Sequence, residues 1–142
     1  MEFLLYLSTQ QMDVYKIVSQ KVRVVENSSI CKKYDVFGFY SSTQKTLSIC
    51  TDKIKSYQNV EKNVNETLMH ESVHVAQSCK TNFRHLTSFG INPSSMPLSY
   101  YKEADLKKVI AFDRNLKNID REAFWMEDKP EKVKYVVQRY CF

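Results

Sequence analysis

TLMHESVH, residues 67–74, is the stretch around which the chain is organised, because it contains an HExxH pattern. On an α-helix, residues four apart lie on the same face, so His70 and His74 can direct their imidazole nitrogens at one metal ion. Glu71 lies about 100° further round the helix, where its carboxylate can accept a proton from water at that ion. If this stretch is helical, the pattern predicts a zinc-dependent hydrolytic site.

The flanking residues favour a helix from Val64 to about Lys80. Asn63, with Glu66 three residues later, has the spacing of an N-cap and capping box. Apolar or small residues recur at helical spacing and leave the histidines on a neighbouring face. These residues are Val64, Leu68, Ser72, Val75 and Cys79. The alternative interpretation is an amphipathic helix whose histidines have only a structural role.

The length of 142 residues fits a single domain spanning residues 1–142. A hydrophobic content of 43%, with only two glycines, favours a globular fold over disorder. The net charge of +5 is spread along the chain, so we expect a solvated basic surface and no nucleic-acid partner.

No stretch approaches the roughly 20 apolar residues that a membrane span needs. The short apolar run at residues 3–7 also lacks the basic start and the small-residue cleavage pattern of a signal peptide. We therefore expect a cytoplasmic or other soluble intracellular compartment.

Four cysteines, Cys31, Cys50, Cys79 and Cys141, are widely spaced and form no CxxC pair, which argues against a structural zinc knuckle. Their pairing does not follow from the spacing. The lack of a secretory segment favours free thiols in a reducing compartment, whereas the even number leaves two disulfides open.

The residues before the HExxH stretch predict one helix and three strands. Residues 8–20 have helical spacing with Ser8 as N-cap, and residues 21–26 alternate like a strand. Residues 36–40 and 46–50 predict a β-hairpin in which Gly38 marks a bulge. An edge strand there would either align an extended peptide beside the metal or be an ordinary sheet edge.

The residues after the HExxH stretch predict an irregular segment followed by helices. Residues 81–97 contain glycine, prolines and serines, which are typical of a long loop. Residues 98–128 return to helical spacing, with a break near Asn115 or Asn118, and Pro130 begins a last helix. We therefore expect an α+β fold with a short mixed or antiparallel sheet, the HExxH helix and C-terminal helices.

A catalytic zinc site needs a third protein ligand. Gln77 and Lys80 occupy the positions that would extend the motif to HExxHxxGxxH, so the sequence favours a glutamate on a separate helix. Glu122 is the preferred candidate, because it lies one turn after Ile119 at the edge of the apolar stripe. The other candidates for the third ligand are Glu103, Glu127, Glu131 and His85. Candidate oxyanion or outer partners of the site are His85, Tyr100, Tyr101 and Asp120.

These residues resemble the zinc metallopeptidases of the gluzincin type, which combine HExxH with a distal helical glutamate, often followed by alanine as in Glu122-Ala123. Residues 38–79, with GFY at 38–40, LSIC at 47–50 and HESVH at 70–74, are also similar to the mitochondrial inner-membrane metallopeptidases that process an ATP-synthase subunit. The chain departs from that family at Gln77, where the family has an acidic residue. The resemblance implies a zincin-like fold and a peptide or protein substrate.

We therefore predict a zinc metallopeptidase, more specifically an endopeptidase, in which His70, His74 and Glu122 bind one zinc ion and Glu71 is the general base. The alternative is a catalytically silent zincin-fold module that binds a protein or nucleic-acid partner. Four protein ligands, or Cys79 as a ligand, would favour that module. The presence of Glu71 favours the enzyme, since a purely structural site needs no general base.

Overall fold

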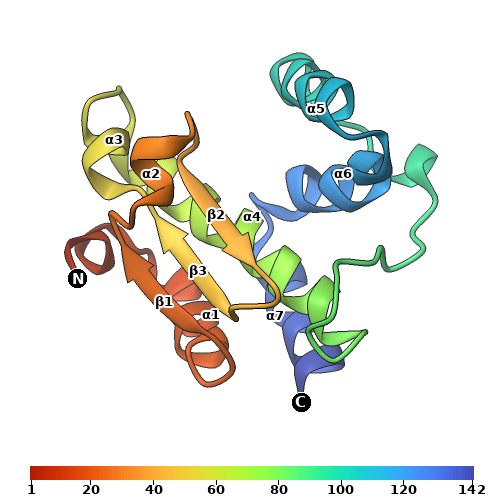
Figure 1. Ribbon diagram of the computed structural model, residues 1–142, viewed down its shortest axis with the longest axis horizontal. Coiled ribbons are helices and arrows are strands. Elements are labelled where there is room, and N and C mark those ends of the chain that lie inside the picture. The colour runs from red at the N-terminus through yellow and green to blue at the C-terminus, as the bar shows by residue number, and fades with distance from the viewer.

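The HExxH motif lies on the central helix of the fold, α4 (Val60–Cys79), in the computed structural model, which describes residues 1–142 (Figure 1). This helix contacts the β-sheet and the helices α1 (Thr9–Val18), α6 (Lys117–Met126) and α7 (Pro130–Cys141). The predicted stripe is confirmed as its inward face, since Val64, Leu68, Ser72 and Val75 are fully buried. Burial of apolar area on several sides therefore fixes this helix, and with it the motif.

The start of α4 differs from the prediction. The helix begins at Val60 after Asn59, which has a φ of 59° and lies in the left-handed region. Asn63 lies inside the first turn, where its side chain donates a hydrogen bond to the Gln58 carbonyl oxygen at 3.0 Å. The predicted capping box was therefore wrong. Asparagine adopts the left-handed conformation at low cost, so Asn59 reverses the chain into the helix one turn earlier.

The sheet contains three short strands, β1 (Arg23–Glu26), β2 (Gly38–Ser41) and β3 (Thr46–Ile49), in the order β1-β3-β2. β1 is parallel to β3, whereas β2 is antiparallel to β3. The predicted hairpin, the mixed sheet and the α+β class are therefore confirmed. β2 is an edge strand and is the strand nearest to α6 in Figure 1.

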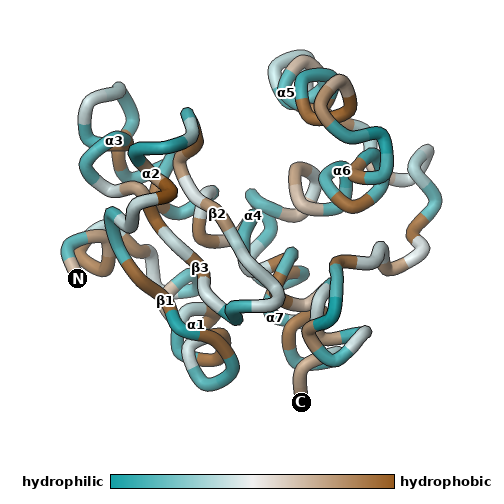
Figure 2. Tube along the Cα trace, in the orientation of Figure 1, coloured by the Kyte–Doolittle hydropathy of each residue, from teal (hydrophilic) through white to brown (hydrophobic).

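The remaining elements are short helices and the helices of the C-terminal half. They are η1 (Glu2–Tyr6), α2 (Ile30–Lys33), α3 (Thr51–Lys55), η2 (Pro93–Ser95), α5 (Tyr100–Phe112) and η3 (Arg114–Leu116). The predicted break is confirmed, because η3 separates α5 from α6. α5 lies at the periphery of the molecule although it contains hydrophobic residues (Figure 2), and only Leu106 of this helix is buried.

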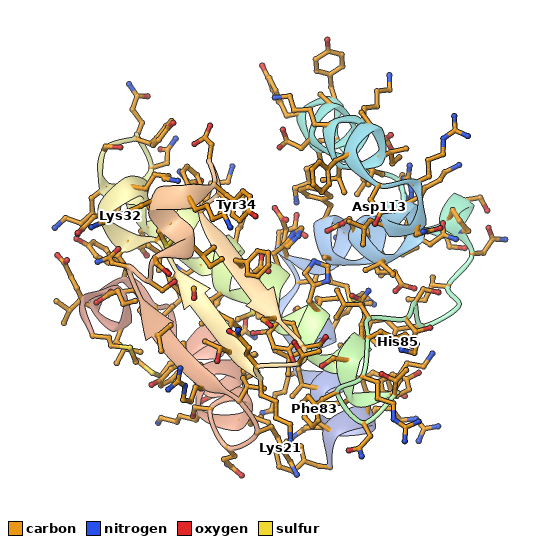
Figure 3. All side chains as sticks on the ribbon, viewed as in Figure 1. Lys21, Lys32, Tyr34, Phe83, His85 and Asp113 are labelled. Atoms are coloured by element: carbon orange, nitrogen blue, oxygen red, sulfur yellow. A yellow bond between two sulfur atoms is a disulfide. The ribbon has the colours of Figure 1, made fainter.

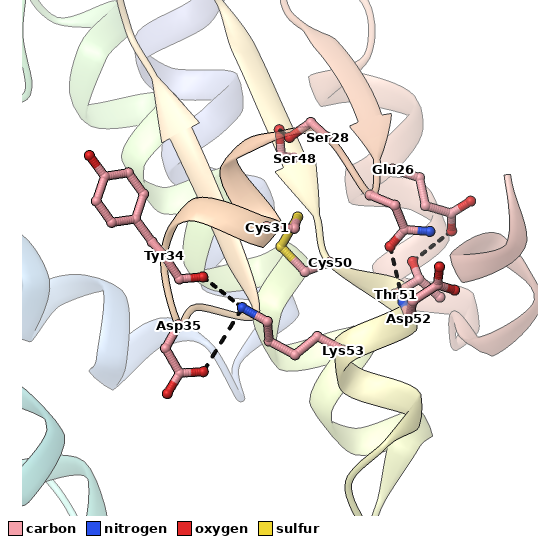
Figure 4. The surroundings of a disulfide bond; sticks show 11 residues. Glu26, Ser28, Cys31, Tyr34, Asp35, Ser48, Cys50, Thr51, Asp52 and Lys53 are labelled. Carbon is pink, nitrogen blue, oxygen red and sulfur yellow. Dashed lines mark hydrogen bonds and ion pairs between the residues drawn. A yellow bond between two sulfur atoms is a disulfide. The ribbon is translucent and has the colours of Figure 1, made fainter.

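All four cysteines are paired, so the expectation of free thiols was wrong. Cys31 bonds Cys50, which links α2 to the segment between β3 and α3 (Figure 4). Cys79 bonds Cys141, which links the end of α4 to the end of α7. The spacing gave no sign of these pairs, because tertiary packing brings the partners together. No helix in the structure is both long enough and apolar enough to cross a bilayer.

Gly38 marks a close approach between β2 and α4, and the predicted bulge is absent because the register with β3 is continuous. A Cβ atom at this position would lie 2.5 Å from Thr67 Cγ2 and 3.2 Å from Glu71 Cγ. Only glycine allows the edge strand to lie this close to the general-base candidate.

We expect Gly38→Ala to lower the free energy of unfolding by about 1–3 kcal/mol, because the added methyl group forces the strand and helix apart. Urea unfolding measures the change. Thr67→Ser removes the clashing Cγ2 atom, so the double variant should recover a large part of the loss. Additive effects of the two substitutions would contradict this account of the contact.

Candidate metal centre

Three side chains converge between α4 and α6. His70 and His74 extend from α4, and Asp120 extends from α6. Asp120 Oδ1 lies 3.0 Å from His74 Nε2 and 3.4 Å from His70 Nε2, and the three ligand atoms all lie within 4.8 Å of one another. In a tetrahedral zinc site with bonds of about 2.0–2.1 Å, neighbouring ligand atoms are about 3.3 Å apart. Two of the three separations are close to this value, so the three side chains could hold a metal ion.

A hydrogen bond at Nδ1 fixes the orientation of the His74 ring. Gln77 Nε2 donates to the Ile119 carbonyl oxygen and to Glu122 Oε1, both at 2.9 Å. Because the amide nitrogen is used in these bonds, the oxygen Oε1 faces His74 and accepts a hydrogen bond from Nδ1 at 2.7 Å. His74 Nδ1 therefore carries a proton, and Nε2 is the nitrogen left for a metal.

His70 has a matching arrangement. Its Nδ1 donates to Glu127 Oε1 at 2.9 Å, and its ring packs edge-on against Phe124 with 4.7 Å between centroids. Lys102 Nζ lies 3.6 Å from the second oxygen of Glu127. Both histidines thus have Nδ1 bound by an outer partner and Nε2 directed at Asp120, which is the arrangement that orients histidine ligands in zinc sites.

Glu122 is not one of the three converging side chains. It is fully buried, and its carboxylate accepts hydrogen bonds from Gln77 and from the main-chain N–H of Phe89 at 2.9 Å. Burial raises the pKa of Glu122, and these hydrogen bonds oppose the rise. The predicted ligand therefore reaches His74 only through Gln77, and the structure brings Asp120 to the two histidines in its place.

The other predicted candidates occupy different positions. His85 lies on the exposed loop that follows α4 (Figure 3), and its main-chain N–H bonds Thr81 Oγ1. Tyr100 and Tyr101 are 83% and 80% exposed at the start of α5. Glu103 forms a salt bridge with Arg121, and Glu131 is exposed. Of the residues predicted as outer partners, only Asp120 lies at the site. Glu127, which was predicted as a possible metal ligand, instead hydrogen-bonds His70 as an outer partner.

Glu71 is 8% exposed and lies where α4 approaches Gly38 of β2. Burial raises the pKa of its carboxyl group, while the nearby positive charges of His70 and His74 oppose the rise. A buried carboxyl group whose pKa is raised is suited to accept and return a proton.

The three converging side chains form a charged cluster when no metal is bound. Burial lowers the pKa of His70, but hydrogen bonds to Asp120 and Glu127 outweigh it and raise that pKa to about 10. Burial also opposes ionisation of His74 and Asp120. The hydrogen bond to Asp120 nevertheless raises the pKa of His74, and the hydrogen bonds to His70 and His74 lower the pKa of Asp120. Protons on the histidines thus occupy the place where a metal would bind.

The sequence analysis did not predict the roles of Gln77, Glu127 and Asp120 in the site, although the spacing of each along the chain gives some indication. Gln77 follows His74 by three residues, which puts both on one face of α4. Asp120 lies in the first turn of α6 and Glu127 directly follows its last residue; the two are seven residues apart, so they lie on the same side of this helix. This seven-residue spacing of Asp120 and Glu127 beside an apolar stripe could have indicated that the two acidic side chains face His70 and His74.

The chain belongs to the family described as a domain of unknown function (DUF8637), whose model matches residues 3–142. Neither the curated proteins nor the solved structures gave a match in the other two comparisons. The geometry of the site is therefore the basis for any assignment of function.

We expect the pH dependence of stability to reverse when zinc is added. In the metal-free protein, the pKa of His70 is raised from about 6.5 to about 10. Between these values the folded state binds more protons than the unfolded state, so the free energy of unfolding falls as pH rises. With zinc, deprotonation of the ligands favours binding, so the free energy of unfolding rises with pH.

Urea unfolding with EDTA and with excess zinc, at a series of pH values from about 6.5 to about 8.5, measures the two slopes. The exposed-loop variant His85→Gln serves as a control and should show the same reversal. Slopes of the same sign with and without zinc would contradict the role of His70 and His74.

We expect Asp120→Ala to abolish stoichiometric zinc binding, because it removes one of the three candidate ligands. Glu122→Gln should weaken zinc binding only about 10–100-fold, since Glu122 acts through Gln77. Glu103→Gln removes one partner of a salt bridge with Arg121 that lies outside the three converging side chains, and it should leave the affinity unchanged. Competition titration against a zinc-binding dye measures all three, and a greater loss in Glu122→Gln than in Asp120→Ala would reverse the assignment.

Proposed function

We propose that the chain is a zinc-dependent metallopeptidase of zincin-like fold that cleaves extended peptide segments. The observation that carries the proposal is the convergence of His70 Nε2, His74 Nε2 and Asp120 Oδ1, with Glu71 between the two histidines in the chain. Three protein ligands leave a fourth position of a tetrahedral ion for water or substrate, as catalytic zinc sites require. The likeness to metallopeptidases read from the HExxH motif supports the same class.

A zinc ion held by these residues supplies a Lewis acid that lowers the pKa of water and polarises a carbonyl group. The chain supplies the proton transfers. Glu71 accepts a proton from the attacking water and returns it to the amine that leaves when the peptide bond breaks. The outer partners Gln77 and Glu127 hold the two histidine rings in place, so that little reorganisation is needed during the reaction.

The free edge of β2 supports a peptide substrate. Cys50 N–H donates to the Phe37 carbonyl oxygen at 2.8 Å, so residues 37 and 50 form a hydrogen-bonded pair. Bonded pairs alternate along an antiparallel ladder, so Phe39 also bonds to β3, whereas Gly38 and Tyr40 direct their main-chain groups to the opposite edge. A peptide in an extended conformation can bond to these groups and add a strand to the sheet.

The position of Gly38 connects the free edge to the chemistry. Glu71 Cγ lies 3.2 Å from the place where a Gly38 Cβ would be. A peptide bonded to the Gly38 main chain therefore passes close to the general base. This alignment favours an endopeptidase, because a strand can extend along β2 in both directions from the site.

The alternative, a catalytically silent binding module, is less well supported. Cys79 is bonded to Cys141, so it offers no thiolate as a fourth ligand that would close the site. The two disulfides favour an oxidising compartment over the cytoplasm.

We expect Glu71→Gln to retain one zinc ion per chain and to lose at least about 100-fold in kcat, because removal of a general base costs about 10²–10⁴-fold. Glu61→Gln, an exposed position on the same helix, is the matched control and should keep full activity. A mixed library of internally quenched peptides, with zinc and with a chelator, provides the assay. Full activity of zinc-loaded Glu71→Gln would rule out the proposed mechanism.

A further inference from the structure

Two exposed aromatic rings stack beside the free edge of β2. Tyr34 and Phe39 have 6.5 Å between ring centroids and an angle of 17° between ring planes. Tyr34 is 45% exposed and Phe39 is 37% exposed, so together they present an apolar surface to solvent. Figure 3 shows Tyr34 next to β2, on the part of the molecule that holds the sheet.

Phe39 points away from α4. Its neighbours Gly38 and Tyr40 face that helix, since Gly38 abuts Thr67 and the Tyr40 hydroxyl lies 2.7 Å from Ser78 Oγ. Successive side chains alternate between the two faces of a strand, so Phe39 projects from the opposite face. The rings therefore lie outside the metal centre and form a separate surface along the same edge.

The main-chain register places Phe39 where it would lie close to a bound strand. Phe39 directs its main-chain groups to its partner Ser48 on β3. Relative to an antiparallel strand on the free edge, Phe39 is thus in a non-hydrogen-bonded position, where facing Cα atoms are about 4.5 Å apart and side chains are closest. The side chain opposite Phe39 in such a strand must contact its ring.

The aromatic surface is held by local bonds. Lys53 Nζ donates to the Tyr34 carbonyl oxygen at 2.6 Å, and the Cys31–Cys50 disulfide ties α2 to the start of α3 (Figure 4). Tyr34 directly follows α2, so these bonds fix its main chain next to the sheet. A surface ordered before binding loses less conformational entropy when a ligand contacts it.

We propose that Phe39 and Tyr34 form a specificity surface that selects a bulky apolar or aromatic side chain in the substrate strand, at the residue paired with Phe39. This inference rests on the proposed function and adds its substrate class, namely extended peptides with such a residue at a fixed distance from the cleaved bond. Burial of the exposed ring faces and aromatic pairing across the two strands provide the preference.

A set of internally quenched ten-residue peptides tests the proposal. Each peptide contains alanine, serine and glutamine with a single phenylalanine placed at one of the positions in turn, and mass spectrometry locates the cut. We expect the rate for zinc-loaded protein to be highest with phenylalanine at one fixed distance from the cut, by about tenfold over serine at that position.

Phe39→Thr keeps a strand-forming residue and removes the ring, so the tenfold preference should fall below about twofold with zinc content unchanged. Phe39→Trp should retain the preference. Tyr135→Ala removes an aromatic residue that is 65% exposed on α7, and it should leave both rate and preference unchanged. Cleavage without a positional preference, or a preference that Phe39→Thr does not reduce, would overturn the specificity surface and leave the proposed function standing.

Calorimetric binding of the same peptides to zinc-loaded Glu71→Gln separates the two proposals further. In one outcome, the protein binds phenylalanine-containing peptides preferentially and loses this preference in Phe39→Thr, while the unmodified protein never cuts them. That result would support the specificity surface and contradict the hydrolytic function. Peptides that are neither bound nor cut would overturn both.

Discussion

The contact of Asp120 with His70 and His74 is the interaction on which the candidate site depends. It joins α6 to the central helix through buried, ionisable groups. Removing such groups from water costs free energy, which their mutual attraction repays only with well-placed hydrogen bonds. The apolar residues of α4 on its other faces supply the stability that offsets this cost. The same three side chains are the group that could hold a metal ion.

The groups behind this contact connect the metal centre to distant parts of the chain. Gln77 and Glu122 link His74 to the loop after α4 through the Phe89 main chain, and Glu127 links His70 to Lys102 at the start of α5. The orientation of each histidine therefore depends on a segment that is remote in sequence. Substitutions in the loop or in α5 can change the site without any contact with a ligand or a substrate.

The parts of the fold governed by local periodicity were predictable from the sequence. The apolar stripe of α4, the hairpin and the helix break near Asn115 depend on residues close in the chain, and the structure has each of them. The place of Glu122 was not predictable, because Asp120 and Glu122 are both buried on α6 and only tertiary packing decides which one meets α4. The disulfides were not predictable either, since Cys79 and Cys141 are 62 residues apart and meet only when α7 packs on α4.

The Cys79–Cys141 bond also determines what a break in the main chain would do. The exposed loop after α4, α5 and α6 all lie between these two cysteines. If the chain is cleaved anywhere between them, the fragment that carries Asp120 remains covalently attached to the helix that carries His70 and His74. The effective concentration of Asp120 at the two histidines is then set by the length of the disulfide-linked chain and not by the concentration of the protein. A nicked molecule can thus bring His70, His74 and Asp120 together again as a single unit.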